Sequence, residues 1–188
     1  LKKKIRMINM SKPRILWHKV RNILGISLSL AKASFKLRNE GNYLGILWYL
    51  LEPLAFFFII LRLRGVLDTD VNNYPVYLFL GLIMFNLFTK TTVMATSIID
   101  INQGFIKSLR IRTESFVLAI MFQMIFSHLF EVVVLGIIMY IYGIGLFNLA
   151  FYPLILIMYS LFITGVSFFL AVVGVYIKDM ENLWRVFT

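Results

Sequence analysis

The sequence predicts an all-α integral membrane protein, with an N-terminal amphipathic helix in the membrane interface, four transmembrane helices after it, and the N-terminus inside. Three observations predict this fold class. Of 188 residues, 60% are hydrophobic and 15% are charged, whereas a soluble domain has about 45–50% apolar and about 25% charged residues. The apolar residues gather in segments of the roughly 20 residues that a transmembrane helix needs. The basic residues lie mostly on one side of these segments.

The first predicted unit, residues 1–42, is a basic cytoplasmic segment. Up to Arg38 it holds 11 of the 19 Lys and Arg residues and no acid. Between Arg14 and Arg38, apolar residues recur at spacings of three and four and form one stripe, namely Trp17, Val20, Leu24, Leu28, Ala31 and Phe35. Such a helix lies in the interface, with its stripe toward lipid and its basic groups near anionic headgroups. The alternative is a helix packed on another cytoplasmic protein. No nucleic-acid partner is expected, because the same chain continues into membrane spans.

The second predicted unit, residues 43–188, is a partial transmembrane domain. Its four predicted spans are about 43–63, 75–98, 115–142 and 151–177, and a mixed basic segment, 99–114, joins the second to the third. Lys and Arg are in excess in cytoplasmic loops of membrane proteins. With the N-terminus inside, 16 basic residues are cytoplasmic and 2 lie outside, so this orientation is predicted.

Four ionisable residues fall within the predicted spans: Glu52, Lys90, His128 and Glu131. A charge at mid-span costs about 2.5–3.5 kcal/mol, so each needs a partner or a wet cavity. Counted from the span ends, Lys90 and Glu131 lie about 13 Å apart in depth. A direct bridge between them is therefore not expected, and Lys90 is predicted to extend toward the inner surface. His128 and Glu131 share one helix face and are read either as satisfied structural groups or as part of a substrate path.

The sequence excludes several kinds of chemistry. There is no Cys and there are only two His residues, which gives no basis for a metal site. It contains no GxxxxGK[ST] nucleotide loop, GxSxG elbow, HExxH motif or paired-carboxylate cluster. We therefore expect no cofactor, no metal and no catalytic centre of a familiar type. Two classes remain: a conduit, and a membrane-embedded enzyme that uses Glu52, or His128 with Glu131, on lipid-linked sugars.

Residues 99–114 form the most informative loop. A loop that only connects two spans can be short and polar, but here apolar and basic residues alternate at spacings compatible with a helix. This pattern favours a helix that docks into a groove on a soluble partner. The alternative is a positively charged inner loop with interfacial anchors.

Several motifs resemble those of the ABC-2 type permeases that export polysaccharides, O-antigens and teichoic acids. Tyr43-Leu-Gly-Ile-Leu-Trp-Tyr-Leu-Leu-Glu-Pro53 resembles the start of their first span, and Pro75-Val-Tyr-Leu-Phe-Leu-Gly-Leu82 with Phe85-Asn-Leu-Phe88 resembles the second. Asn102 to Leu109 with Glu114 resembles their cytoplasmic coupling segment, and Tyr176-Ile-Lys-Asp179 resembles the residues after their fourth span. Two departures are Ile111-Arg112, where the family usually has Phe-Pro, and the absence of the two further spans that complete the family's six.

The resemblance implies a permease, not an enzyme, in the inner (cytoplasmic) membrane. Two copies would form a channel for a lipid-linked glycan or polyol phosphate polymer, and separate ATPase subunits would grip the coupling segments. The residues that this implies for ATPase docking are Phe105, Ile106, Lys107, Leu109 and Arg110. The candidate substrate path consists of Tyr49, Glu52, Phe56, His128 and Glu131. The alternatives are the membrane-embedded enzyme and a truncated, non-transporting fragment.

Overall fold

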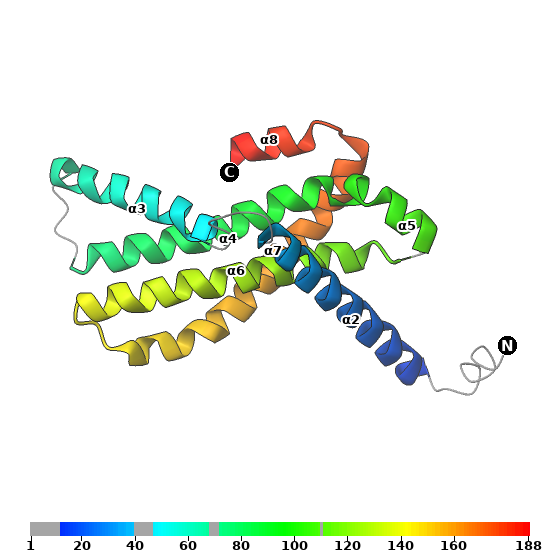
Figure 1. The fold of residues 1–188 in the computed structure, drawn as a ribbon, viewed down its shortest axis with the longest axis horizontal. Helices are drawn as coiled ribbons and strands as arrows, with labels where there is room; N and C mark the ends of the chain where they lie inside the picture. Colours follow the sequence, from blue (N-terminus) through cyan, green and yellow to red (C-terminus); the bar gives the residue numbers. More distant parts are fainter. Residues whose placement is uncertain (1–11, 40–46, 68–71, 110) are drawn as a thin grey trace.

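The computed structural model describes residues 12–39, 47–67, 72–109 and 111–188, and every regular element in these ranges is a helix. The elements are α2 (Lys12–Asn39), α3 (Leu47–Leu67), α4 (Tyr74–Ile101), α5 (Gln103–Leu109), α6 (Glu114–Ile141), the 3-10 turn η1 (Leu146–Phe151), α7 (Tyr152–Tyr176) and α8 (Met180–Phe187) (Figure 1). The prediction of an all-helical fold is confirmed for the described residues.

Three of the described helices are long and apolar enough to cross a membrane. They are α4, α6, and α7 with the end of η1 before it. Their bounds lie within a few residues of the predicted spans 75–98, 115–142 and 151–177. The first predicted span coincides with α3, which carries Glu52, Arg62 and Arg64 and is not among the three. The count of four spans is therefore not confirmed.

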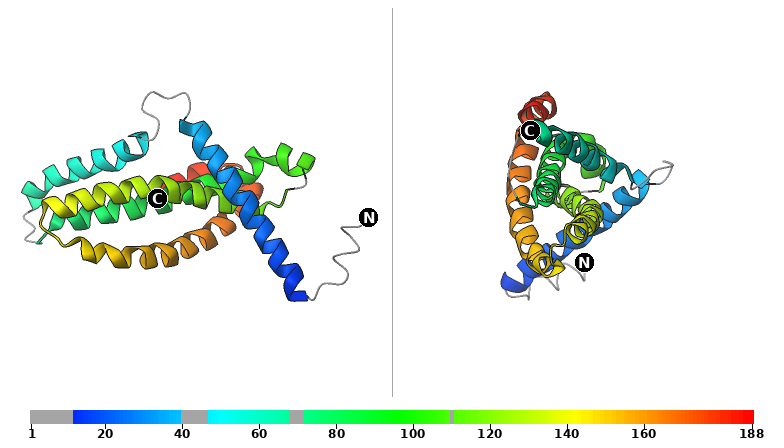
Figure 2. Two further views of the ribbon diagram at one scale, coloured as in Figure 1. Left: turned by 60° about the horizontal axis from the view of Figure 1, so that its bottom comes forward. Right: turned by 90° about the vertical axis from the view of Figure 1, so that its left-hand side faces the viewer.

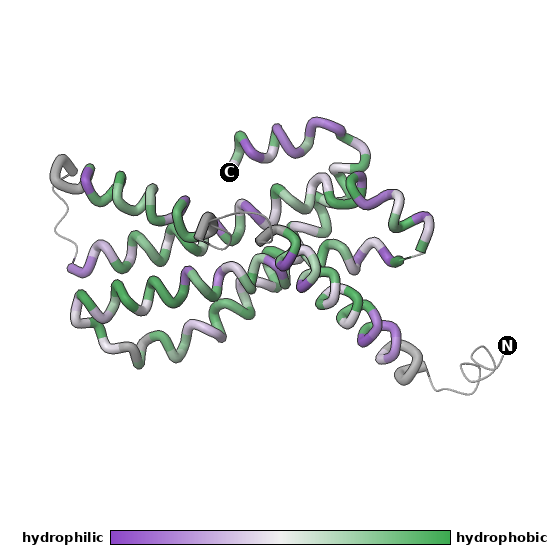
Figure 3. The backbone as a smooth tube through the Cα atoms, in the orientation of Figure 1, coloured by the Kyte–Doolittle hydropathy of each residue, from purple (hydrophilic) through white to green (hydrophobic). Residues whose placement is uncertain are grey.

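Helix α4 is the centre of the bundle. It packs against α7, α6, α3 and α8, and it lies antiparallel to α6 (Figure 1). Seen along the bundle, α2 and α7 flank the pair formed by α4 and α6 (Figure 2). Apolar colour dominates the long helices, whereas hydrophilic residues gather on α5, α8 and the N-terminal part of α2 (Figure 3). The hydrophilic residues of the described chain are thus concentrated in α5, α8 and the start of α2.

Two apolar clusters hold this bundle together. The outer cluster joins α3, α4 and α6 through Phe57, Phe79, Ile83, Leu135 and their neighbours. The ring of Phe57 meets that of Phe79 edge to face, with centroids 5.4 Å apart. The inner cluster joins α4, α6 and α7 through Leu87, Ala95, Ile120, Met121, Met124 and Ile163. Aromatic pairs of this geometry stabilise a fold by about 0.5–1.5 kcal/mol beyond the effect of their buried area. Phe57 is the residue through which α3 joins the buried part of this cluster.

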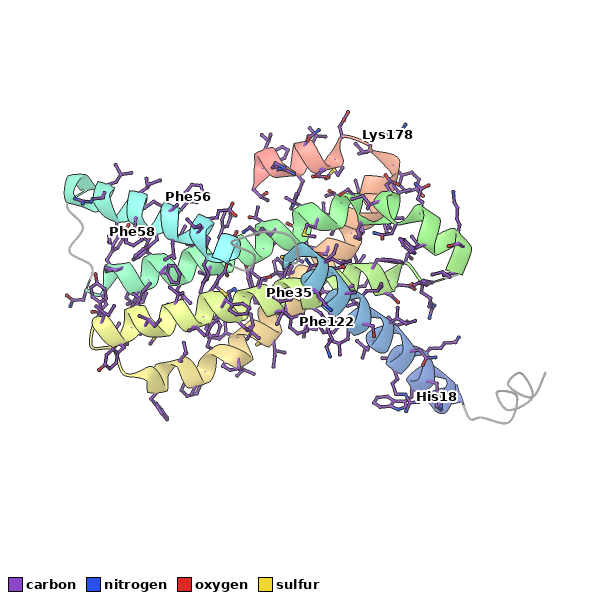
Figure 4. The ribbon with its side chains drawn as sticks, in the orientation of Figure 1. His18, Phe35, Phe56, Phe58, Phe122 and Lys178 are labelled. Carbon is purple, nitrogen blue, oxygen red and sulfur yellow. The ribbon has the colours of Figure 1, made fainter. Side chains whose placement is uncertain are left out.

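Helix α2 crosses α6 obliquely and packs on it (Figure 2). Ser27 and Ala31 are fully buried there, and their small side chains let the two helices approach closely. Phe35 points toward α6 (Figure 4), where its ring stacks on that of Phe130 at a centroid distance of 6.5 Å.

The buried face of α2 therefore differs from the predicted stripe. Ala31 is buried and Phe35 contacts α6, but Trp17, Val20, Leu24 and Leu28 are 38–66% exposed. One side of the helix packs on protein, and these four residues remain as the face predicted to meet lipid. The face of α2 that packs on α6 and its exposed apolar face lie next to each other around the helix. The spacing of apolar residues in the sequence therefore does not distinguish one face from the other.

The crossing of α4 and α7 depends on small residues. Ala171 and Ser167 on α7 and Ala95 and Thr92 on α4 are all at most 1% exposed. At Gly174 the backbones are so close that an added Cβ atom would lie 1.8 Å from the carbonyl oxygen of Thr96. Lipid chains are as apolar as the helix surfaces, so the hydrophobic effect does not drive helices together within a membrane. Close backbone packing of this kind is a main source of helix–helix attraction there.

Gly174→Ala should therefore push α7 away from α4 and lower the free energy of unfolding by about 1–3 kcal/mol, as overpacking does in tight cores. The measurement is thermal unfolding of the purified chain in detergent. Gly165→Ala on the same helix is the control, because its added Cβ atom has nothing within 4 Å. Equal stability of the two variants would contradict the close crossing.

Candidate functional site

Helix α5 projects from one end of the bundle, between the ends of α4 and α6 (Figure 1). None of its seven residues is buried. Phe105 and Leu109 are 60% and 62% exposed and lie four residues apart, which places them on one face. Lys107 is exposed and Ile106 is half-buried. We call Phe105, Ile106, Lys107 and Leu109 the α5 patch. The fifth predicted docking residue, Arg110, lies outside the described residues.

Hydrogen bonds tie α5 to the end of α4. The amide of Ile106 donates to the carbonyl of Asn102 at 3.0 Å, and the Asn102 side chain donates to the carbonyl of Ile98 at 2.9 Å. Beyond Arg110, the amide of Ser115 donates to the carbonyl of Arg112 at 3.0 Å at the start of α6. Among the described residues, α5 is thus joined by hydrogen bonds directly to α4.

A buried polar network joins α4, α6 and α7 in the middle of the bundle. His128 and Glu131 on α6 are 1% and 3% exposed. Nδ1 of His128 lies 2.7 Å from Oε2 of Glu131, and Asn86 on α4 donates its amide nitrogen to Oε1 at 2.8 Å. Nε2 of His128 lies 2.5 Å from the hydroxyl of Tyr152, the first residue of α7.

The donors and acceptors of this network match in either protonation state of the ring. If the ring is neutral, Nδ1–H donates to Glu131 and Nε2 accepts from the Tyr152 hydroxyl. If the ring is charged, Nε2–H donates to Tyr152, whose hydroxyl then donates to Sδ of Met84 at 3.4 Å. Both nitrogens of His128 and both oxygens of Glu131 are engaged. Buried polar groups that are fully satisfied in this way stabilise one arrangement of the helices.

Lys90 on α4 forms an ion pair with Glu52 on α3, with Nζ and Oε2 2.6 Å apart. The prediction that Lys90 extends toward the inner surface did not include this partner. Lys90 also lines one small cavity, of about 10 Å³, together with Glu131 and His128. The depth estimate from the span ends overstated the separation of Lys90 from Glu131, because Asn86, about one turn before Lys90 on α4, already bonds Glu131 at 2.8 Å.

The predicted substrate-path residues do not all come together. Glu52 and Phe56 line a cavity of about 450 Å³ between α3, α4 and α8, and Phe56 stands out from α3 (Figure 4). His128 and Glu131 are buried inside the bundle instead. The side chain of Tyr49 lies outside the described residues. A substrate path through these five residues stays a prediction.

Sequence reasoning missed the partners Asn86 and Tyr152, and the cavity residues Thr89 and Arg185. Asn86 lies about one helical turn before Lys90 on α4. Its bond to Glu131 forms because α4 is set against α6, which no local pattern reveals. Tyr152 looked like an ordinary aromatic residue at a span end. One signal in the sequence could have found them. A buried His–Glu pair needs further polar partners, and the few polar residues in these spans were the candidates.

His128→Leu should lower the free energy of unfolding by about 3–5 kcal/mol, because it leaves the buried carboxylate of Glu131 without its closest partner. The measurement is thermal unfolding in detergent. The double variant His128→Leu with Glu131→Leu should lose much less, because no buried charge is then unpaired. A double variant as unstable as the single one would contradict the network.

No family model matches the chain. The chain is similar to the O-antigen export system permease protein RfbA of Myxococcus xanthus, with 19% identity over 161 residues, which is 85% of this chain. The match covers 62% of that protein, so the chain spans less than two thirds of its length. Across this distance, the relative supports the resemblance of the chain to the ABC-2 type permeases of O-antigen export.

Proposed function

We propose that the chain is the permease subunit of an ABC exporter that moves a lipid-linked polysaccharide or polyol phosphate polymer out across the cytoplasmic membrane. Two copies form the conduit, and separate ATPase subunits drive it. The α5 patch is the observation that carries the proposal. The similarity to a protein named as an O-antigen export permease supports the transport role and a glycan cargo.

The α5 patch has the composition of a docking helix. An exposed apolar pair, Phe105 and Leu109, with a cation beside it suits a hydrophobic groove that has an acidic rim. The sequence contains no nucleotide-binding loop, so the energy for transport has to come from a partner. An ATPase that holds α5 would move the adjoining end of α4 through the hydrogen bonds at Asn102.

The enzyme alternative is less well supported by the geometry. A general acid or base needs a free atom within reach of its substrate. In His128 and Glu131 both nitrogens and both carboxylate oxygens already have partners, and both residues are almost fully buried. Their hydrogen bonds instead give them a structural role in the bundle.

Reversing the charge at Lys107 and Arg110 to Glu should abolish co-purification of the ATPase subunit from the chain's own cells, because it places two acids against an acidic rim. Membrane insertion should be unchanged. The matched control is Lys178→Glu, at an exposed lysine beyond α7 (Figure 4). Undiminished co-purification of the double variant would argue strongly against docking through α5.

The sidedness of α5 can be measured independently, because the chain has no Cys. A single Ser108→Cys on α5 should react with a membrane-impermeant thiol reagent only after the cells are opened. Asn72→Cys, in the exposed turn before α4, should react in intact cells. The opposite labelling pattern would overturn both the orientation and the proposed ATPase contact.

A further inference from the structure

The cavity between α3, α4 and α8 has a mixed lining. Two phenylalanines form its apolar part: Phe56 from α3 and Phe85 from α4, each 54% exposed. Its polar part comes from Glu52, Asn86, Thr89 and Arg185. The volume of about 450 Å³ falls within the range of roughly 300–1,000 Å³ that is usual for small-molecule sites. The cavity is therefore large enough for a ligand and carries polar groups from three helices.

The charges in this wall are already balanced. Glu52 is paired with Lys90 at 2.6 Å, and Arg185 is paired with Glu181 at 2.7 Å. An anionic ligand would have to compete with Glu52 or Glu181 for a cation, and it would face the repulsion of the displaced carboxylate. A cationic ligand would meet the same difficulty with Lys90 and Arg185. The charge pattern thus favours an uncharged ligand.

The remaining polar groups suit a ligand with many hydroxyls. Asn86 lines the cavity and donates its amide nitrogen to Glu131, and its amide oxygen is a further acceptor. The Thr89 hydroxyl is buried and has no hydrogen-bond partner among the described residues. A hydroxyl group can donate and accept at once, so a polyhydroxyl ring could satisfy both residues.

The two phenylalanines suit the other surface of such a ring. An aromatic face carries a negative quadrupole that attracts weakly positive C–H groups, and a pyranose ring presents C–H groups on its faces and hydroxyls around its edge. Phe56 and Phe85 come from neighbouring helices and border one cavity with the polar residues. The lining therefore matches a sugar ring, which has apolar faces and hydroxyl groups around its edge.

We propose that this cavity holds one uncharged glycosyl unit of the exported polymer. The proposal rests on the proposed function and narrows it, because it favours an uncharged polysaccharide over a polyol phosphate polymer as cargo. Phe56 and Phe85 border the sugar faces, and Glu52, Asn86 and Thr89 accept or donate hydrogen bonds at its edge.

The test places the photoreactive analogue p-benzoylphenylalanine at position 85 of the full chain, in cells that make the polymer. After irradiation, the chain is purified and its adducts are analysed for carbohydrate and for phosphorus. The expected adduct contains neutral sugar and no polyol phosphate. The same analogue at position 169 is the control, because Phe169 lies on α7, is 66% exposed and does not line the cavity. It should capture lipid only.

A second variant separates binding from folding. Thr89→Val keeps the shape of the side chain and removes a hydroxyl that has no partner, so the fold should be unaffected. The sugar adduct at position 85 should fall about three- to tenfold, the loss expected for one hydrogen bond. A polyol phosphate adduct, lipid alone at position 85, equal sugar capture at position 169, or an unchanged yield with Thr89→Val would each overturn the proposal.

This result is independent of the ATPase contact. Photocapture needs no ATP, so a sugar adduct together with failed docking at α5 would retain the cavity site and reject the proposed drive. Loss of co-purification in the α5 variant with no sugar at position 85 would do the reverse.

Discussion

The buried carboxylate of Glu131 is the constraint on which the arrangement of the long helices depends. In an apolar bundle a carboxylate has to find its partners within the protein, and this one takes them from its own helix and from α4. Through His128 it also reaches α7. These contacts fix the rotation of α6 about its own axis relative to α4 and α7. Apolar packing alone would specify that rotation only loosely. The positions of the outer and inner apolar clusters follow from that rotation.

Much of the fold could be predicted from local pattern. The bounds of α4, α6 and α7 follow from runs of apolar residues and from the polar turns between them, because a span of that length needs no tertiary information. The face of α2 was harder. Its periodicity gave one stripe that includes Ala31, but Ser27, which is buried against α6 beside it, is a small polar residue that hydropathy does not single out. Close packing of helices in a membrane favours small residues, so hydropathy is a poor guide to this contact.

The candidate site was predictable only where it is local. The α5 patch could be recognised because its apolar and basic residues are adjacent in sequence and exposed together. The partners of Lys90 and Glu131 depend on how α3, α4 and α6 are set side by side. A shift of α4 by one turn, about 5.4 Å, would exchange them. The cavity beside Phe56 likewise needs α8 to fold back along α4, where the indole nitrogen of Trp184 donates to the Thr92 hydroxyl at 2.9 Å. Nothing in the local sequence specifies that return.

The missing side chain at Gly174 has a mechanical consequence. At Thr96 the backbone of α4 lies directly against that of α7, so no side chain there can repack when the two helices move past each other. Relative motion of the two helices at this crossing has to open the contact. By contrast, α3 meets α4 through side chains, including the ring of Phe57 and the ion pair of Glu52, and such contacts can repack.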